Sequence, residues 1–505
     1  MKILSIQLAD IFNSLQPFEA INLSHVPRED NKIDPICLIG INGSGKSNLL
    51  ELIVEIFYYV ESLHRFGRNK PKTIKKLEIV YTLQRVKNKK IKISTLNSSS
   101  PKIYTTPDDA EKWTEIKSSK AILDCLPTKV VGYTSGMNET LSFRLNQLDE
   151  EYSEDVRINA KLKSTKPVPD NRMIFLDYES NEAIVASNFL FRTSTDLDVF
   201  NDLLRIKGLD SFRLIINLKR KGKSGRGNFV ILSNELQNNL DKLRRCSVCN
   251  IWQAEEGYFE FDFLNTEATK QAFRDHFGSV YNLFMAFQKF ELLNSLNLEK
   301  KYRKTVTKDD ITDNKPTLAR EDKVFRFEEI QLNISKPEKT IPYFGISDGE
   351  HQFLQIIGAI MIFQQEDVLF LLDEPETHFN PTWRTKFIHI INEQMKGRDQ
   401  ELVLTTHSPF VVSDCKGYRV FKFIRIDDKV SFDEIGIETF GTSFDVILRK
   451  AFDIKETISE EAISEIKTLL GSDNKEDIQE FVDNTGPSFE KLALLKHLKE
   501  LNSED

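Results

Sequence analysis

Eight residues, GINGSGKS, place Gly40, Gly45, Lys46 and Ser47 at the spacing of a phosphate-binding loop. Glycines let backbone N–H groups turn toward phosphates, the lysine reaches the β- and γ-phosphates, and the hydroxyl ligates Mg²⁺. A chance match in a glycine-rich turn is the alternative, but an apolar run at 36–39 precedes the loop and a helical pattern follows it. The residues assigned to nucleotide binding are Gly40, Asn42, Gly43, Ser44, Gly45, Lys46 and Ser47.

Two carboxylates, Asp373 and Glu374, follow the apolar run at 368–372. Such a run is typical of a buried parallel strand. The first acid is placed to hold Mg²⁺, directly or through water, and the second to polarise an attacking water. A further apolar run ends at His407, which could contact the γ-phosphate. Alone, the acids could start a helix before Pro375 and the histidine could cap a strand. Their order after the loop indicates phosphoryl-transfer chemistry instead.

The stretch ISDGEHQ places Ser347, Gly349 and Glu350 at the start of an apolar helical pattern. A serine followed three residues later by glutamate is the spacing of a capping box. The N-terminus of a helix is also an anion site. The turn could therefore be an ordinary capped core helix or a second contact for a phosphate.

The order GINGSGKS, ISDGEHQ, LLDEPETHFNP and TTHSP resembles the ABC-type ATPase heads. These include the SMC proteins, the RecF-like proteins and AAA-named ATPases of bacterial defence islands. The resemblance implies that Ser347, Gly349 and Glu350 bind ATP held by another subunit, in a head-to-head dimer that encloses two ATPs. The catalytic residues that it implies are Asp373, Glu374 and His407, and the Mg²⁺ ligands are Ser47 and Asp373.

Two places depart from the pattern of these heads. His378 stands where an aliphatic residue is commoner, in the stretch 375–381 that follows the carboxylates. The Q-loop of the family should follow the first β-hairpins, but the stretch 126–143 offers no glutamine in a clear pattern. No Q-loop residue is assigned.

The bulk composition favours a cytoplasmic protein. Net charge is −8, from 69 basic and 77 acidic residues, which argues against a protein that coats nucleic acid along its whole surface. No apolar run approaches the length of a membrane span, and the first residues lack a signal-peptide pattern. Five cysteines, an odd number, fit a reducing compartment.

The expected fold class is α/β, a two-lobed ABC-type head with an inserted mixed domain and a helical tail. The first lobe, 1–144, would carry the phosphate loop and a β-hairpin extension. The inserted mixed α/β domain would span 145–340, and the second lobe, 341–440, would carry the remaining motifs. The tail, 441–505, shows amphipathic helix patterns for docking, oligomerisation or simple capping. No sustained heptads occur, so long coiled-coil arms are not expected.

Two smaller features have competing interpretations. The run at 219–227, KRKGKSGRG, could contact nucleic acid through Lys219 to Arg226, or it could be a solvated hairpin turn. Cys246 and Cys249 form a lone C-x-x-C, which could bind zinc, act in redox chemistry or serve as plain cysteines. A structural zinc site needs four ligands, and no second C-x-x-C exists.

The whole chain resembles AAA-family ATPases found with bacterial restriction or anti-phage systems. That resemblance implies a sensor or scaffold that controls a separately encoded effector, often a nuclease or toxin. No Asp-x-Asp follows His407, so a metal nuclease in the tail is not expected. The alternative is a RecF-like DNA-repair or recombination ATPase that acts on DNA. A transporter subunit would need a Q-loop, and the Ser-Asp-Gly-Glu turn argues against an AAA+ ring motor.

Overall fold

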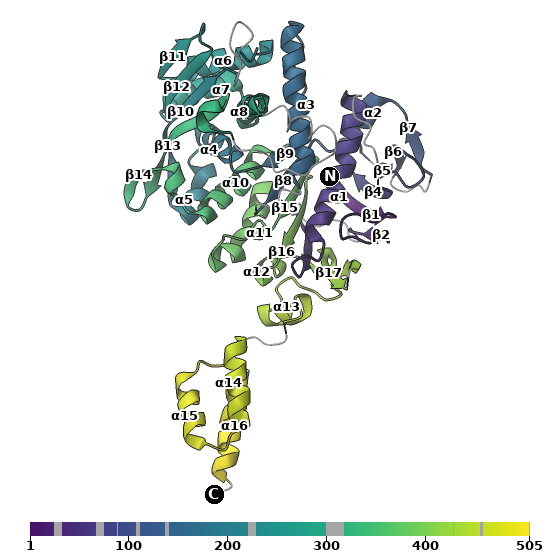
Figure 1. Ribbon diagram of the computed structural model, residues 1–505, viewed down its shortest axis with the longest axis vertical. Coiled ribbons are helices and arrows are strands. Elements are labelled where there is room, and N and C mark those ends of the chain that lie inside the picture. Colours follow the sequence, from purple (N-terminus) through teal and green to yellow (C-terminus); the bar gives the residue numbers. More distant parts are fainter. Residues whose placement is uncertain are drawn as a thin grey trace. The chain divides into compact units, whose positions relative to one another are not determined.

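The computed structural model describes residues 1–24, 33–66, 75–87, 89–107, 112–136, 141–220, 229–298, 318–427, 429–454 and 458–503 (Figure 1). The chain divides into two compact units, Met1–Gly441 and Thr442–Asp505. Helices and strands alternate in the first unit, so the predicted mixed α/β class is confirmed. None of the helices in the described ranges is long and apolar enough to cross a membrane.

A seven-stranded sheet forms the centre of the first unit, in the order β18-β17-β3-β16-β15-β8-β9. Only β18 runs antiparallel to its neighbour. The strands are β3 (Ile36–Gly40), β8 (Lys129–Thr134), β9 (Met173–Leu176), β15 (Val368–Asp373), β16 (Glu401–Thr406), β17 (Val420–Ile426) and β18 (Lys429–Glu434). Every residue of β3, β15 and β16 is buried, as expected of parallel strands covered on both faces. Their carboxyl ends therefore meet at one edge of the sheet.

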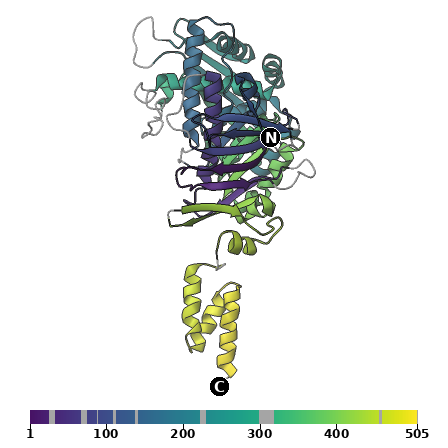
Figure 2. The same ribbon diagram turned by 90° about the vertical axis from the view of Figure 1, so that its right-hand side faces the viewer.

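A six-stranded antiparallel sheet lies beside helix α1 (Lys46–Glu61), in the order β2-β1-β4-β5-β6-β7. Figure 2 shows these strands side by side. They are β1 (Lys2–Leu8), β2 (Phe18–Asn22), β4 (Leu77–Thr82), β5 (Lys89–Ser94), β6 (Lys102–Pro107) and β7 (Thr114–Ile116). Buried residues alternate along β4 with half-buried ones, and one apolar core joins this sheet to α1 and the central sheet. The core holds the phosphate-loop helix between the two sheets.

A five-stranded antiparallel sheet lies in the segment expected to be inserted, in the order β11-β12-β10-β13-β14. The strands are β10 (Ile206–Asn217), β11 (Cys249–Gln253), β12 (Tyr258–Leu264), β13 (Phe325–Ser335) and β14 (Glu338–Pro342). Phenylalanine rings fill the space between this sheet and its helices; those of Phe212 and Phe263 stack at 4.6 Å. The same segment also contains β9, which joins the central sheet, so the two sheets are not separated along the chain.

The helices around these sheets are α2 (Ser119–Asp124), α3 (Ser142–Lys161), α4 (Ser180–Phe191), α5 (Asp198–Leu204), α6 (Asn234–Cys246), α7 (Glu267–Phe277), α8 (Val280–Leu292), α10 (Asp348–Ile362), α11 (Pro381–Met395) and α12 (Pro409–Val412). Helices α4 and α10 pack closely because Gly358 has no side chain. A Cβ there would lie 2.5 Å from Ile184 Cγ2. The Asn188 side-chain amide also donates to Gly358 O at 3.0 Å. This contact fixes α10, which begins directly after Ser347.

The second unit contains α13 (Phe444–Ala451), α14 (Glu460–Leu470), α15 (Lys475–Asn484) and α16 (Phe489–Ser503). Helices α14 to α16 share a small core of Ile466, Ile478, Val482, Leu494 and Leu498. Phe489 and Leu492 are exposed at the start of α16. Helices α14 to α16 therefore form a three-helix element with its own core.

Two of the smaller predicted features can be placed only in part. Most of the basic run lies outside the described residues, which include Lys219 and Arg220 from it; Lys219 pairs with Glu256 at 3.3 Å. Cys246 is buried and Cys249 is exposed. Among the residues that the structure describes, no group of three or more His, Cys, Asp or Glu side chains is arranged to hold a metal ion.

Candidate active site

The phosphate loop connects β3 to α1, and its glycines have backbone angles that other residues rarely adopt. Gly43 and Gly45 have φ values of 75° and 91°. A Cβ at Gly45 would lie 3.0 Å from Ser14 Oγ and 3.1 Å from Leu15 Cδ2. The loop therefore needs glycine for both conformation and space. It also ends at the N-terminus of α1, whose free N–H groups favour an anion.

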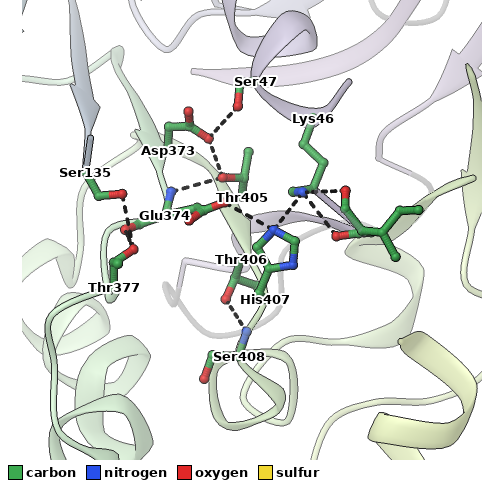
Figure 3. A network of polar contacts seen from close by, with 12 residues as sticks. Lys46, Ser47, Ser135, Asp373, Glu374, Thr377, Thr405, Thr406, His407 and Ser408 are labelled. Atoms are coloured by element: carbon green, nitrogen blue, oxygen red, sulfur yellow. Dashed lines mark hydrogen bonds and ion pairs between the residues drawn. The ribbon is translucent and has the colours of Figure 1, made fainter. Parts of the chain in front are cut away.

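The Lys46 ammonium bonds to its own loop. Its Nζ donates to Gly40 O at 3.1 Å and Ile41 O at 3.2 Å, and lies 2.9 Å from His407 Nε2 (Figure 3). Burial lowers the pKa of Lys46, while the charges of Glu374 and Asp373 oppose that shift. A phosphate oxygen would offer this buried cation a stronger partner than neutral carbonyls.

Asp373, at the end of β15, receives two hydrogen bonds on the same oxygen. Ser47 Oγ donates to Oδ1 at 3.0 Å, and Thr405 Oγ1 donates to it at 2.5 Å. Burial raises the pKa of Asp373, while the hydrogen bonds from Thr405 and Ser47 lower it. A serine hydroxyl beside a carboxylate fits Mg²⁺, which takes one or two protein oxygens together with phosphate oxygens and water.

Glu374 has a left-handed backbone, with φ of 49°. Such strain in a residue other than glycine costs of order 1–3 kcal/mol and is commonest at functional sites. Its N–H donates to Thr405 Oγ1 at 3.0 Å, and its Oε1 lies 3.1 Å from His407 Nε2. The hydrogen bond from His407 is the main cause of the lowered pKa of Glu374. Glu374 is therefore held ionised, as a proton acceptor must be.

His407 Nε2 has two candidate partners and one hydrogen-bonding position. When protonated it donates to Glu374, and when unprotonated it accepts from Lys46. It cannot do both at once. If Lys46 moved to a phosphate, His407 would be left with Glu374 alone, so the occupancy of the loop would change the environment of the carboxylate.

Several hydroxyl residues of the site were missed in the sequence. Thr405 joins Asp373 to the Glu374 backbone, and Thr134 Oγ1 lies 3.4 Å from Asp373 Oδ2 at the end of β8. Thr134 lies within the stretch where the family's Q-loop was sought. Ser135, the next residue, bonds to Thr377 at 3.1 Å. The sequence feature that could have indicated Thr134 and Thr405 is the position of each threonine at the end of an apolar run.

The Ser347 turn forms the predicted capping box at the start of α10. Ser347 N and Oγ donate to Glu350 Oε2 at 2.7 and 2.8 Å, and Glu350 N donates to Ser347 Oγ at 3.4 Å. A Cβ at Gly349 would lie 2.6 Å from His378 O, so this position requires glycine. Ser347 is exposed. Within the part of the chain that the structure describes, no hydrogen bond or ion pair joins the turn to the residues around Lys46.

His378 lies close to α10 through its backbone. Its N–H donates to Gln352 Oε1 at 3.1 Å, and Gln352 Nε2 donates to Tyr133 OH at 2.8 Å. The side chain of this histidine, which departs from the family pattern, takes no part in these bonds. The chain after Glu374 is therefore tied to the same helix that begins at Ser347.

Glu376 is a buried carboxyl behind the site. Thr406 donates to Glu376, and Ser408 N donates to Thr406 Oγ1 at 2.9 Å, so the carboxyl supports both sides of His407. Burial raises the pKa of Glu376 from 4.5 to about 7, against the hydrogen bond from Thr406. Between these two pH values the folded protein holds a proton that the unfolded chain has lost. The contribution of Glu376 to the unfolding free energy therefore falls as pH rises through this window.

Replacing Glu376 with glutamine is expected to remove this pH dependence. Each pKa unit corresponds to about 1.4 kcal/mol, so the wild type should lose on the order of 3 kcal/mol relative to Glu376→Gln between pH 4.5 and pH 8. Urea unfolding of both proteins at several pH values would measure the difference. The matched control is Glu393→Gln, on the exposed side of α11, whose unfolding free energy should change with pH as that of the wild type does. If the unfolding free energy of Glu376→Gln also changed with pH as in the wild type, the raised pKa would not belong to Glu376.

Comparison with known proteins gives one family match and several weaker similarities. Residues 250–413 match the family described as "AAA domain, putative AbiEii toxin, Type IV TA system". Protein ea59 of Escherichia phage lambda is 28% identical over 114 residues, which are 23% of this chain and 22% of that protein. The matched segment thus spans about a fifth of the relative.

The solved structures that are similar to the chain include SMC heads. The SMC head domain from Thermotoga maritima gives a TM-score of 0.36 at 10% identity, over 86% of this chain and 100% of that one. The SmcHead bound to the C-winged helix domain of ScpA gives a TM-score of 0.35 at 11% identity, over 86% and 98%. The family match contains Asp373, Glu374 and His407, and the phosphate loop lies outside it. Residues 250–413 are therefore similar to the AAA domain of that family.

Proposed function

We propose that this protein is an ATP-driven switch, which binds and hydrolyses ATP with Mg²⁺ and controls a separately encoded effector in anti-phage defence. The observation that carries the ATPase part is the convergence of Lys46, Ser47, Asp373, Glu374 and His407 at one edge of the central sheet (Figure 3). Loop, metal-ligand and base positions all lie within one hydrogen-bonded network.

Each residue of this network has a task in hydrolysis. The loop N–H groups and Lys46 hold the phosphates, and Ser47 and Asp373 would hold Mg²⁺, which supplies charge neutralisation when bound. Glu374 accepts a proton from the attacking water, because its lowered pKa keeps it ionised. His407 orients Glu374 through the 3.1 Å contact. Thr405 fixes both carboxylate-bearing residues.

The Ser347 turn is proposed to complete the ATP site of a second copy. It is exposed, and its hydroxyl is positioned by Glu350. The capping box occupies the N–H groups of Ser347 and Glu350, so the N–H groups between them would receive the anion. In this arrangement Glu350 supports Ser347, and Ser347 contacts the γ-phosphate.

Mixing two inactive variants tests this arrangement. Lys46→Ala disables the loop of its own chain, and Ser347→Arg blocks the turn offered to a partner. An equal mixture should regain about a quarter of wild-type hydrolysis, since half of the dimers would be mixed and each would hold one intact site. Each variant alone should stay inactive, and a mixture no more active than its components would rule out a site shared between chains.

The defence role is supported by the family match. That family is described as an AbiEii toxin of a type IV toxin–antitoxin system, and the curated relative is a phage protein. An ATPase that changes its assembly state with nucleotide is suited to hold or release another protein. The proposed effector is a nuclease or toxin on a separate chain.

Affinity capture from the native host tests the effector. Tagged Glu374→Gln protein with ATP would be the bait, and Lys46→Ala, which cannot enter the ATP state, would be the matched control. Mass spectrometry should find a stoichiometric nuclease or toxin with the first variant and less of it with the second. Replication or repair proteins with DNA, and no toxin, would instead favour a RecF-like role.

A further inference from the structure

A cavity of about 700 Å³ lies in the first unit, apart from the phosphate loop. It opens at the carboxyl ends of β8 and β9 and is lined by residues of α4, α8 and α10. Its size falls within the range of small-molecule pockets, and ligands of open α/β sheets bind at this edge. Neither Asp373 nor the phosphate loop lines it, so the mechanism proposed above leaves this cavity without an assigned function.

The described residues of the lining carry more acidic than basic side chains. Among the described residues that line the cavity are Asp177, Glu179, Glu291 and Asp348, against the single ammonium of Lys323. That ammonium already pairs with Glu179 at 2.6 Å. Burial lowers the pKa of His351, so the imidazole adds no positive charge at neutral pH. A phosphate-bearing ligand would be repelled, and a cation would be attracted.

An aromatic ring lies among these carboxylates. The Tyr178 side chain lines the cavity and is 67% exposed, and its ring lies 5.6 Å from that of His351. Aromatic faces attract ammonium and guanidinium groups, and nearby carboxylates add to that attraction. Buried amides also line the cavity, and among the described residues Asn181 Oδ1 has no hydrogen-bond partner, so it remains as an acceptor.

We propose that this cavity binds a small organic cation, recognised through its primary ammonium or guanidinium group by Tyr178 and the surrounding carboxylates. The cation could be an aliphatic polyamine or an arginine-like molecule, which share this chemistry. Binding itself does not depend on the ATPase function, but the regulatory consequence described next rests on that proposed function.

The cavity is connected to the candidate active site through its own lining. Thr134 and Ser135 face it and also contact Asp373 and Thr377. Gln352 lines it and holds the His378 backbone at 3.1 Å. Asp348, in the first turn of α10, follows Ser347 directly. A cation seated here would therefore alter ATP turnover by shifting residues on both sides of the proposed ATP interface.

Titration calorimetry on the full chain without nucleotide tests the binding. Spermidine and L-argininamide would be titrated separately, and fully acetylated spermidine would serve as the neutral probe. At least one of the two cations should bind with about 1:1 stoichiometry, and the acetylated compound should not. Binding by only one of them would identify the preferred group. No binding of either at millimolar concentration would overturn the proposal.

Two variants locate the site. Tyr178→Ala and Glu179→Gln should each weaken binding by about fivefold or more, and Tyr178→Phe should retain it because the ring remains. Phe489→Ala and Glu338→Gln are the matched controls, since Phe489 is 74% exposed and Glu338 pairs with Lys207 as Glu179 does with Lys323. If all of these proteins bound the cation with equal affinity, the binding would reflect non-specific attraction to an acidic chain, and the proposed site would be wrong.

The Lys46→Ala variant separates this proposal from the proposed ATPase function. It should bind the cation as the wild type does, because the phosphate loop does not line the cavity. Cation binding without ATPase activity in any preparation would support the cation site and contradict the proposed ATPase function. ATPase activity without cation binding would support the ATPase function and contradict the cation site.

Discussion

Replacing Glu374 with glutamine is expected to slow ATP hydrolysis by about 100- to 1000-fold while ATP binding is retained, as for loss of a general base. Glutamine keeps the length of the side chain and its oxygen can still accept from His407, so the 3.1 Å contact is preserved. Only the ability to take a proton from water is lost. Phosphate release at saturating ATP and calorimetric ATP binding would measure the two effects separately.

The control for this variant is Glu393→Gln, on the exposed part of α11, which should hydrolyse ATP at the wild-type rate. Glu374→Gln should also accumulate as a nucleotide-bound dimer on size-exclusion chromatography with ATP, because the bound state cannot decay. Turnover at the normal rate in Glu374→Gln would show that another group accepts the proton. Thr405 would then only link the Asp373 carboxylate to the Glu374 backbone.

Replacing Lys46 with alanine is expected to weaken ATP binding by about 30-fold to more than 1000-fold. Losing one partner of a buried charge pair costs roughly 2–5 kcal/mol, and each 1.4 kcal/mol is a factor of ten in affinity. The ammonium is buried beside Glu374 and Asp373, and Lys46 is the one basic residue of the eight-residue loop. Calorimetry or fluorescent ATP displacement would give the affinity.

A fold control is needed because Lys46 also donates to Gly40 O and Ile41 O. The melting temperature of Lys46→Ala should stay close to that of Lys396→Ala, an exposed change on the same chain. ATP affinity equal to the wild type in a folded Lys46→Ala protein would show that the loop is not the phosphate site.

Much of the candidate site could be predicted because each of its motifs is contiguous in sequence. The phosphate loop is one eight-residue stretch, and Asp373 with Glu374 follows a run of apolar residues directly. Buried parallel strands have no polar face, so β3, β15 and β16 were visible as apolar runs. The mixed α/β class follows from the same runs alternating with helical patterns.

The remainder depends on contacts between distant segments. Nothing local to Thr134 indicates that β8 pairs with β15 and brings its hydroxyl to Asp373. The sequence around Gly349 does not show why a glycine is needed at the start of this helix. The reason is the close approach of His378 O, which leaves no space for a side chain. The division into lobe, insert and lobe stays a prediction, and nothing local to β9 indicates that this strand extends the central sheet.

The position of β3 between β16 and β17 also governs how the protein is made. Lys46 and His407 are 361 residues apart, so the ribosome needs roughly 20 to 70 seconds to deliver the neighbours of β3. Until then a fully apolar strand has both edges unpaired, which favours aggregation and makes chaperone assistance valuable. A nascent chain that ends before position 407 lacks His407 and carries no finished candidate site. The residues of this site can therefore come together only after β16 and β17 have been translated.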